Sequence, residues 1–542
     1  MSDTKLEIQH QEKTETEHVE QAPRHPDVQP DGVDDALREF GDERIEVTEE
    51  DNRRIRIRTD MFLLPILAWT YWLQILDKTI LGYASVFGLK ADTHLVGNQY
   101  SQLGSLNAIA QLVWQPFSSY LLVRVKPRHL MPIIVTCWGI SCCGFAASSS
   151  FPGLAACRFL LGLFEAACLP LFSILTSVWY RRAEQPMRVA IWYGTNGLGT
   201  IMASVFAYGF GHVENSPLKH YQMLYLLCGL LTVVTGPIIY WRLDNNITEA
   251  RFLTPEDRHK GVERLRANNT GTSATNKYKW NQVVECLIEP QTYLFLGMTL
   301  LVNVGASVTT VFGPLVLSGL GFDKYKTSLL NMPFGALQVI IIWITSYCSY
   351  QFKNKSLTII VMTIPVIVGL ALLWALPRDN QGLLLFAYYL LAFLYGINPL
   401  IISWLSANTA GSTKRSITIS GFNGASAAGN IVGPYLFKDS EAPLYLSGLK
   451  ASLIIFIVLM AATILQIINF WVLNRMKSRE RVKNGKPAKI HDSSMDKKFR
   501  VFQKDETKDT DKVEASTTGV QLGENAFLDL TDRQNDEFVY VF

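Results

Sequence analysis

The sequence predicts an all-α membrane protein in which twelve transmembrane helices form two halves of six. Composition is the first reason, because 49% of the 542 residues are hydrophobic and only 18% are charged. The apolar residues gather in segments of about 20 residues or more, the length that a helix needs to cross a bilayer. The order of the segments is the second reason, since six of them precede a polar gap and six follow it.

The chain opens with a polar stretch, residues 1–58, which is rich in acidic residues, Gln, His and Pro. Such a composition cannot bury enough apolar surface to fold, so we expect a disordered cytoplasmic tail. The first half, residues 59–243, follows it. Its apolar segments lie near residues 61–87, 99–123, 130–149, 153–180, 188–212 and 221–243.

The polar gap, residues 244–289, is predicted to be a cytoplasmic central loop. Thr254-Pro255-Glu256-Asp257 indicates the start of a short amphipathic helix there, with Pro and acids in its first turn. The second half is residues 290–474. Residues 475–542 form a charged cytoplasmic tail, which we expect to be disordered except for one candidate apolar anchor, Phe527-Leu528-Asp529-Leu530. The segments of this half lie near residues 290–319, 327–350, 356–376, 382–406, 416–437 and 447–473.

The orientation is predicted from Lys and Arg near the helix ends, because cytoplasmic loops carry an excess of both. The basic set of loops shares one side with the central loop and both tails, so we expect both termini to be cytoplasmic. The same loops are expected to act as gates. Their candidate gating residues are Arg124, Arg128, Arg181, Arg182, Arg188, Lys414 and Arg415.

Four charges lie inside the apolar segments and are nearly the only ones there. Arg158 and Glu165 are seven residues apart, close to two helical turns, so both leave one helix face about 10 Å apart. Asp77 and Lys78 are adjacent in the first segment. A charge at membrane depth costs at least about 2.5–3.5 kcal/mol, so such residues face a cavity or a partner. We interpret them as the working centre of a transporter.

Asp77 and Glu165 are the candidates for proton coupling. A carboxylate in a low-dielectric cavity takes up a proton more readily, and a neighbouring cation opposes this, so an arriving substrate can switch it. Lys78 and Arg158 would hold an anionic substrate, Lys78 as a point charge and Arg158 with a bidentate grip. In this scheme Glu165 and the substrate compete for Arg158. The alternative is that these charges form only structural ion pairs.

Asn196 and Asn423 lie in polar helices rich in small residues, and each is predicted either to line the cavity or to form an interhelical hydrogen bond. A net charge of +3 without a basic face argues against a nucleic-acid partner. No nucleophile–base pair and no metal-ligand spacing is visible. We therefore expect that the protein is not an enzyme and binds no metal or cofactor. We expect a monomer in the lipid bilayer whose transport is driven by a proton gradient.

Motifs typical of one family recur along the chain. They are Leu76-Asp77-Lys78, Gln115-Pro116, Arg124-Val125-Lys126-Pro127-Arg128, Trp138-Gly139, Arg158 through Ala166, Trp179 through Gln185 with Arg188, Asn196 through Gly199, Gly321 through Tyr325, Asn408 through Arg415, and Phe527 through Asp532. With these motifs the sequence resembles the fungal allantoate-permease family, the anion:cation symporter branch of the major facilitator superfamily.

This resemblance implies proton-coupled uptake of a small organic anion by alternating access, with a carboxylate such as allantoate, a ureido acid or a vitamin acid as substrate. It also implies Asp77 and Glu165 as proton carriers and Lys78 and Arg158 as substrate cations. The sequence departs from better-understood relatives where Lys78 replaces an Arg. We expect the plasma membrane, with the endoplasmic reticulum or another endomembrane as the alternative location. The alternative functions are a facilitator or exporter with structural ion pairs, a carrier of a thiamine-type substrate, and a nutrient sensor.

Overall fold

The computed structural model describes residues 45–542 except 87–88, 97–98, 212, 214–215, 267, 269–277, 311–323, 378–379, 438–440, 442–444, 491–493 and 495–527. Every regular element in these described ranges is a helix, which confirms the predicted all-α class. The predictions for residues 1–44, for the end of the segment 290–319 and for Phe527 lie outside the described residues.

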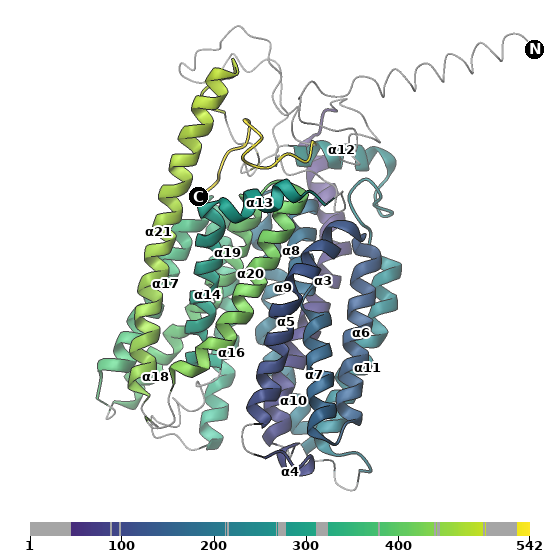
Figure 1. Ribbon diagram of the computed structural model, residues 1–542, viewed down its shortest axis with the longest axis vertical. Helices are drawn as coiled ribbons and strands as arrows, with labels where there is room; N and C mark the ends of the chain where they lie inside the picture. Colours follow the sequence, from purple (N-terminus) through teal and green to yellow (C-terminus); the bar gives the residue numbers. More distant parts are fainter. Residues whose placement is uncertain are drawn as a thin grey trace, which may run out of the picture.

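Two groups of helices stand side by side (Figure 1). The first group consists of α3 (Glu49–Val86), α4 (Leu89–Asp92), α5 (Gln99–Arg124), α6 (Pro127–Ala147), α7 (Phe151–Glu165), α8 (Cys168–Trp179), α9 (Gln185–Tyr193), α10 (Thr195–Gly211) and α11 (His220–Arg242). The second group consists of α14 (Pro290–Thr310), α16 (Lys324–Phe352), α17 (Lys355–Ala375), α18 (Gln381–Leu390), η2 (Leu391–Phe393), α19 (Leu394–Ala407), α20 (Ser412–Val432), η3 (Gly433–Leu436) and α21 (Leu446–Lys483).

Each predicted apolar segment coincides, in its described part, with one of these helices or with two or three consecutive ones. Seven stretches among the described residues are long enough and apolar enough to cross a membrane, judged by length and composition alone. They are Pro127–Ala147, Phe151–Trp179, His220–Arg242, Pro333–Phe352, Lys355–Ala375, Gln381–Ala407 and Leu446–Lys483. The count of twelve spans stays a prediction.

Local signals in the sequence set several helix ends. Pro127 and Pro290 open α6 and α14, where a missing N–H costs nothing. Asn354 and Asn380 cap α17 and α18, because each side chain accepts a hydrogen bond from a backbone N–H three residues further on. Gly411 precedes α20 with φ of 87°, a conformation that other residues adopt only with strain.

The polar gap carries two helices, α12 (Pro255–Arg266) and α13 (Trp280–Ile288), where the sequence predicts one. The predicted start at Thr254-Pro255 is confirmed, and Thr254 Oγ1 accepts a hydrogen bond from the Asp257 N–H. The strongly amphipathic second helix, α13, packs on α20, whose Thr413 and Lys414 N–H groups both donate to Gln282 Oε1 at 3.0 and 3.1 Å. Each half therefore carries one helix of the gap.

The first helix begins earlier than the sequence predicts. Residues 49–58, assigned above to a disordered tail, are the first turns of α3 and pack against α12. Arg54 and Arg58 both bind Asp257 of α12, at 2.5 and 2.8 Å, and Asp51 binds Lys260 at 3.1 Å. Partners distant in sequence thus give this polar stretch the stability that its composition lacks.

Near the other terminus, residues 528–542 lie against the second half and are largely buried, whereas the sequence predicts a disordered tail with one anchor. They run across the same end of the bundle as α12 and α13 (Figure 1). We call this the α12–α13 end.

Candidate functional site

Helices α3 and α7 bring the four predicted charges into one cluster. Lys78 Nζ lies 2.8 Å from Glu165 Oε1, and Arg158 Nη1 lies 3.9 Å from Asp77 Oδ1. Each acid therefore faces the cation of the other helix. Asp77, Arg158 and Glu165 are buried, whereas 41% of the Lys78 side chain is exposed.

This pairing differs from the scheme in which Glu165 competes for Arg158. Adjacent residues on a helix point about 100° apart, so Asp77 and Lys78 reach different positions along α7. Lys78 meets Glu165 at the end of α7, and Asp77 is directed toward Arg158, two turns earlier. The cation that holds Glu165 in this conformation is thus the exposed Lys78.

Arg158 is incompletely paired although it is buried. Its Nε and Nη1 atoms have no hydrogen-bond partner among the described residues. Asp77 accepts hydrogen bonds from Trp138 Nε1 at 3.2 Å and from Cys142 Sγ at 3.6 Å, both on α6. A buried guanidinium with unused donors is unfavourable, so the site favours a further acceptor, such as a carboxylate.

Glu165 has a second partner that the sequence reading missed. Asn107 Nδ2 on α5 donates to Glu165 Oε2 at 3.0 Å, and Gln111 Nε2 donates to Asn107 Oδ1 at 2.9 Å. Gln115 continues this buried polar stripe one turn further. Amide side chains at a spacing of four in an apolar helix share one face, and this signal was available in the sequence.

The helix breaks directly after Glu165, where α7 ends and α8 begins at Cys168. Pro170 has no N–H, so the Ala166 carbonyl loses its helical donor. Asn423 Nδ2 of α20 donates to that carbonyl at 2.9 Å, with Gln115 Nε2 at 3.4 Å. Asn423 thus forms the interhelical bond left open above, and it connects the second half to the residue beside Glu165.

Asn196 is placed differently from Asn423. It is the second residue of α10 and is half-buried. None of the hydrogen bonds found within the described ranges joins its side chain to the four charges. A second bond between the halves comes instead from Asn398 on α19, whose Nδ2 donates to the Tyr193 hydroxyl at 3.0 Å. The Tyr193 ring stacks on Tyr71 of α3 with centroids 5.4 Å apart.

At the α12–α13 end, several predicted gating residues form a buried network on the first half. Arg188 binds Asp60 with two nitrogens, at 2.7 and 3.1 Å. Arg264 of α12 binds Glu184 in the loop between α8 and α9. Burial would raise the pKa of Glu184, but the charges of Arg264, Arg188 and Arg181 outweigh it and lower that pKa to about 2.

The other predicted gating residues divide into two groups. Lys414 is buried among three carboxylates, with its Nζ 2.9 Å from Glu285, 2.6 Å from Glu289 and 2.8 Å from Asp532. Arg415, beside it, is buried as well, and Arg182 contacts residues 538–539. Arg124 and Arg128 instead lie over the rings of Tyr120 and Tyr240 in their own half.

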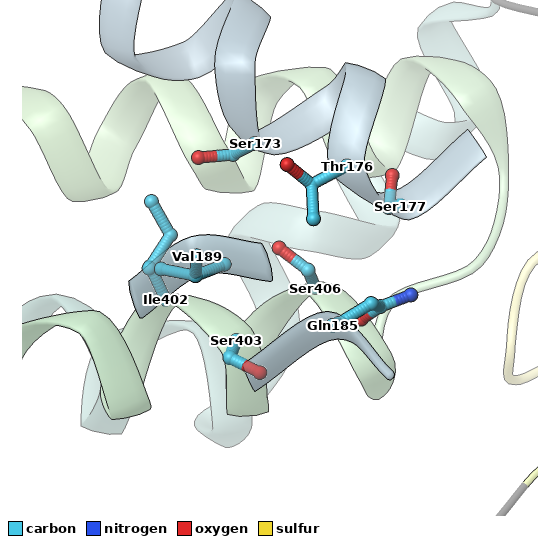
Figure 2. A pocket seen from close by; sticks show the side chains of 8 residues that line it. All are labelled: Ser173, Thr176, Ser177, Gln185, Val189, Ile402, Ser403 and Ser406. Carbon is cyan, nitrogen blue, oxygen red and sulfur yellow. The ribbon is translucent and has the colours of Figure 1, made fainter. Parts of the chain in front are cut away.

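Between the charges and the α12–α13 end, α8 and α9 face α19 across a seam of hydroxyl groups (Figure 2). The space between these side chains is too narrow to hold a water molecule. Nearer the end, Ser416 Oγ of α20 donates to the Ser119 carbonyl of α5 at 2.8 Å. The halves are therefore closed on this side. The residues that line the seam are Ser173, Thr176, Ser177, Gln185, Val189, Ile402, Ser403 and Ser406.

Comparison with known proteins fits this architecture. The family model of the Major Facilitator Superfamily matches residues 67–434. A thiamine pathway transporter of Saccharomyces cerevisiae is 33% identical over 73% of this chain and 76% of its own. The allantoate permease of the same yeast is 27% identical over 83% and 85%. A solved proton:xylose symporter, 14% identical, superposes with a TM-score of 0.57 over 78% of this chain and 96% of its own, which shows the fold.

Proposed function

The chain belongs to the Major Facilitator Superfamily, with fungal relatives that include allantoate permease, and on that premise we propose that it takes up a small organic anion together with protons. It is a multi-pass membrane protein of a transporter family. The observation that carries the proposal is the four-charge cluster, in which a partly exposed Lys78 neutralises a buried Glu165. The relative named as a permease for allantoate, a carboxylate, supports an anionic substrate.

Charge balance favours transport of an anion together with at least one proton. The four ionised side chains sum to zero, so a bound monoanion leaves the buried cluster one negative charge in excess. A low-dielectric site disfavours such an uncompensated charge, and a proton on one carboxylate removes it. A cationic solute would instead need a carboxylate to stay ionised and unpaired, and both acids already face a cation.

The proposed cycle begins at Lys78, because it is the exposed cation. A substrate carboxylate that binds Lys78 takes it from Glu165, which then has no counter-charge and accepts a proton. Arg158, with unused donors, supplies the second contact to the anion. On the other side of the membrane the proton leaves Glu165, which regains Lys78 and displaces the substrate. Asp77 could carry a further proton in the same manner.

We place the α12–α13 end in the cytoplasm, following the basic loops, and assign twelve spans, a monomer and the plasma membrane. The seam between α8, α9 and α19 is closed on that side, so this conformation would receive substrate from outside the cell. The bonds of Asn423 and Asn398 across the halves would then break as the cytoplasmic side opens.

The test compares Glu165→Gln with wild type in cells and in reconstituted vesicles. Competition by a panel of carboxylic acids, ureides and vitamins against one labelled acid first identifies a substrate. Glu165→Gln imitates the protonated side chain, so it should exchange substrate across the membrane without accumulating it. Glu256→Gln is the matched control, because this exposed acid of α12 lies outside the helical bundle.

Accumulation by Glu165→Gln that still collapses with an uncoupler would remove Glu165 from the coupling role. Equal uptake of an uncharged amide analogue of the substrate would count against the anion. Inhibition by thiamine but by none of the acids would favour a cationic substrate instead.

A further inference from the structure

Residues 528–542 are largely buried against the bundle. Leu528, Asp532, Phe538 and Tyr540 are exposed by 3% or less. In Figure 1 residues 528–542 form the yellow segment that crosses the α12–α13 end. Neither the charge cluster nor the proposed transport cycle uses residues 528–542, which we call the terminal segment.

The second half recognises the backbone of this segment. Asn408 Oδ1 accepts from the Val541 N–H at 2.8 Å and its Nδ2 donates to the Val541 carbonyl at 3.0 Å. Asn474 of α21 does the same with Tyr540, at 2.9 and 2.8 Å. Trp404 Nε1 adds a bond to the Val541 carbonyl at 2.9 Å. Two asparagines that each satisfy a complete backbone unit hold the chain in one register.

Charged side chains strengthen the same attachment. Asp532 binds the buried Lys414 at 2.8 Å and accepts the Tyr540 hydroxyl at 2.8 Å. Lys486, beyond the end of α21, binds Asp536 at 2.8 Å and Glu537 at 3.0 Å. These contacts all lie within the second half and its own continuation, so they do not change when the two halves move apart.

The first half touches the segment through the loop between α8 and α9. Arg182 Nη1 donates to the Val539 carbonyl at 3.1 Å, and its guanidinium lies 4.3 Å from the centre of the Phe538 ring. The next residue, Ala183, donates its N–H at 3.3 Å to the carbonyl of Ser494, which follows α21 and lies outside the terminal segment. Arg182 is 1% exposed, so both contacts are shielded from water. A desolvated guanidinium on an aromatic face is among the stronger contacts of this kind.

We propose that the terminal segment is a strap that holds the cytoplasmic mouth closed, anchored on the second half and held by Arg182 of the first. Opening of the mouth must separate Arg182 from Phe538 and Val539, while the asparagine and lysine anchors stay in place. The strap therefore favours the closed mouth without taking part in substrate binding. Its removal should shift the two-state equilibrium toward the open mouth.

The first experiment measures how often the mouth opens. A Ser406→Cys reporter in the closed seam is labelled with a membrane-impermeant maleimide in inside-out vesicles, against the background of the chain without the reporter. Arg182→Ala should raise the labelling rate roughly tenfold, and Arg182→Lys, which keeps the charge but loses the plane, should lie between. Arg258→Ala is the control, since its guanidinium binds the Ala250 carbonyl of its own loop. An unchanged rate in Arg182→Ala would overturn the strap.

A second experiment replaces the contact between Arg182 and Phe538 with a covalent tether. Arg182→Cys and Phe538→Cys are joined by a short cleavable bis-thiosulfonate reagent, with each single variant treated in parallel. The tether should stop uptake of the labelled acid and a reductant should restore it. Full uptake by completely tethered protein would show that transport does not require the strap to separate from the loop between α8 and α9. The maleimide labelling rate of the first experiment is measured without substrate. It therefore tests the strap even if the proposed anion transport is wrong.

Discussion

The hydrogen bond from Asn423 to the Ala166 carbonyl can be tested by a double-mutant cycle between Asn423 and Pro170, for which the structure predicts the sign of the coupling energy. Asn423 compensates for the donor that Pro170 lacks, and it does so from the other half. A neutral hydrogen bond contributes about 0.5–1.5 kcal/mol net. Gln115 keeps a longer bond to this carbonyl at 3.4 Å, so we take about 1 kcal/mol for Asn423→Ala. In the proposed cycle this bond breaks when the cytoplasmic side opens, so the open-to-closed ratio should rise about fivefold.

Pro170→Ala changes the outcome of the same substitution. Its new N–H can bond the Ala166 carbonyl within one helix, in the open and the closed state alike. Asn423→Ala should then change the ratio by less than about twofold, which leaves a coupling energy of about 0.6–1 kcal/mol.

The assay is the maleimide labelling rate at Ser406→Cys for the wild type, both single variants and the double variant. Asn303→Ala is the control, because its two side-chain hydrogen bonds, to the Thr299 carbonyl and from Ser426 Oγ of α20, both lie within the second half. An effect of Asn423→Ala that is the same size with Pro170 and with Ala at position 170 would refute this reasoning.

Three further predictions concern the charges. Lys78→Ala should abolish accumulation of a labelled acid in uptake assays, whereas Lys78→Arg should retain part of it, since the cation beside Glu165 is kept. Asn107→Leu should leave the amount of protein in the membrane unchanged but move the pH profile of uptake, because Glu165 loses a donor. Burial and then the charge of Asp532 raise the pKa of Glu289 from 4.5 to about 7, so the docked state holds one more proton than the undocked state, and the strap should bind less tightly as pH rises from about 4.5 to about 7. Limited proteolysis of the C-terminal residues at a series of pH values measures this. Docking lowers the pKa of Asp532 from 3.8, so protonation of Asp532 weakens docking only at a pH below about 3.8, outside this range.

The composition of the site could be predicted from the sequence, but its pairing could not. Charges in apolar helices are rare and costly, so Asp77, Lys78, Arg158 and Glu165 are conspicuous. Which cation meets which acid depends on how α3 and α7 are rotated about their axes, and hydrophobic periodicity is too coarse to fix that. Asn107 was within reach of sequence reasoning through its spacing with Gln111.

The ends of the chain show a different limit. Composition correctly identifies them as polar, and from this the sequence predicts disorder over residues 1–58 and 475–542. Residues 49–58 and 528–542 are ordered by partners far away in sequence, such as Asp257 for Arg54 and Asn408 for Val541. Asn408 and Asn474 bind backbone atoms, which every residue carries. The contacts of these two asparagines therefore leave no side-chain pattern in the terminal segment that predicts them.

The central claim is that a substrate anion binds Lys78 in place of Glu165, and that Glu165, without its counter-charge, then takes up a proton. Proton uptake on substrate binding, followed with a pH-sensitive dye in weakly buffered detergent solution, tests it most directly. Wild type and the Glu256→Gln control should take up about one proton for each monoanion bound, and Glu165→Gln, which still binds the anion, should take up none through this site. Binding by Glu165→Gln with the same proton uptake as wild type would contradict the account.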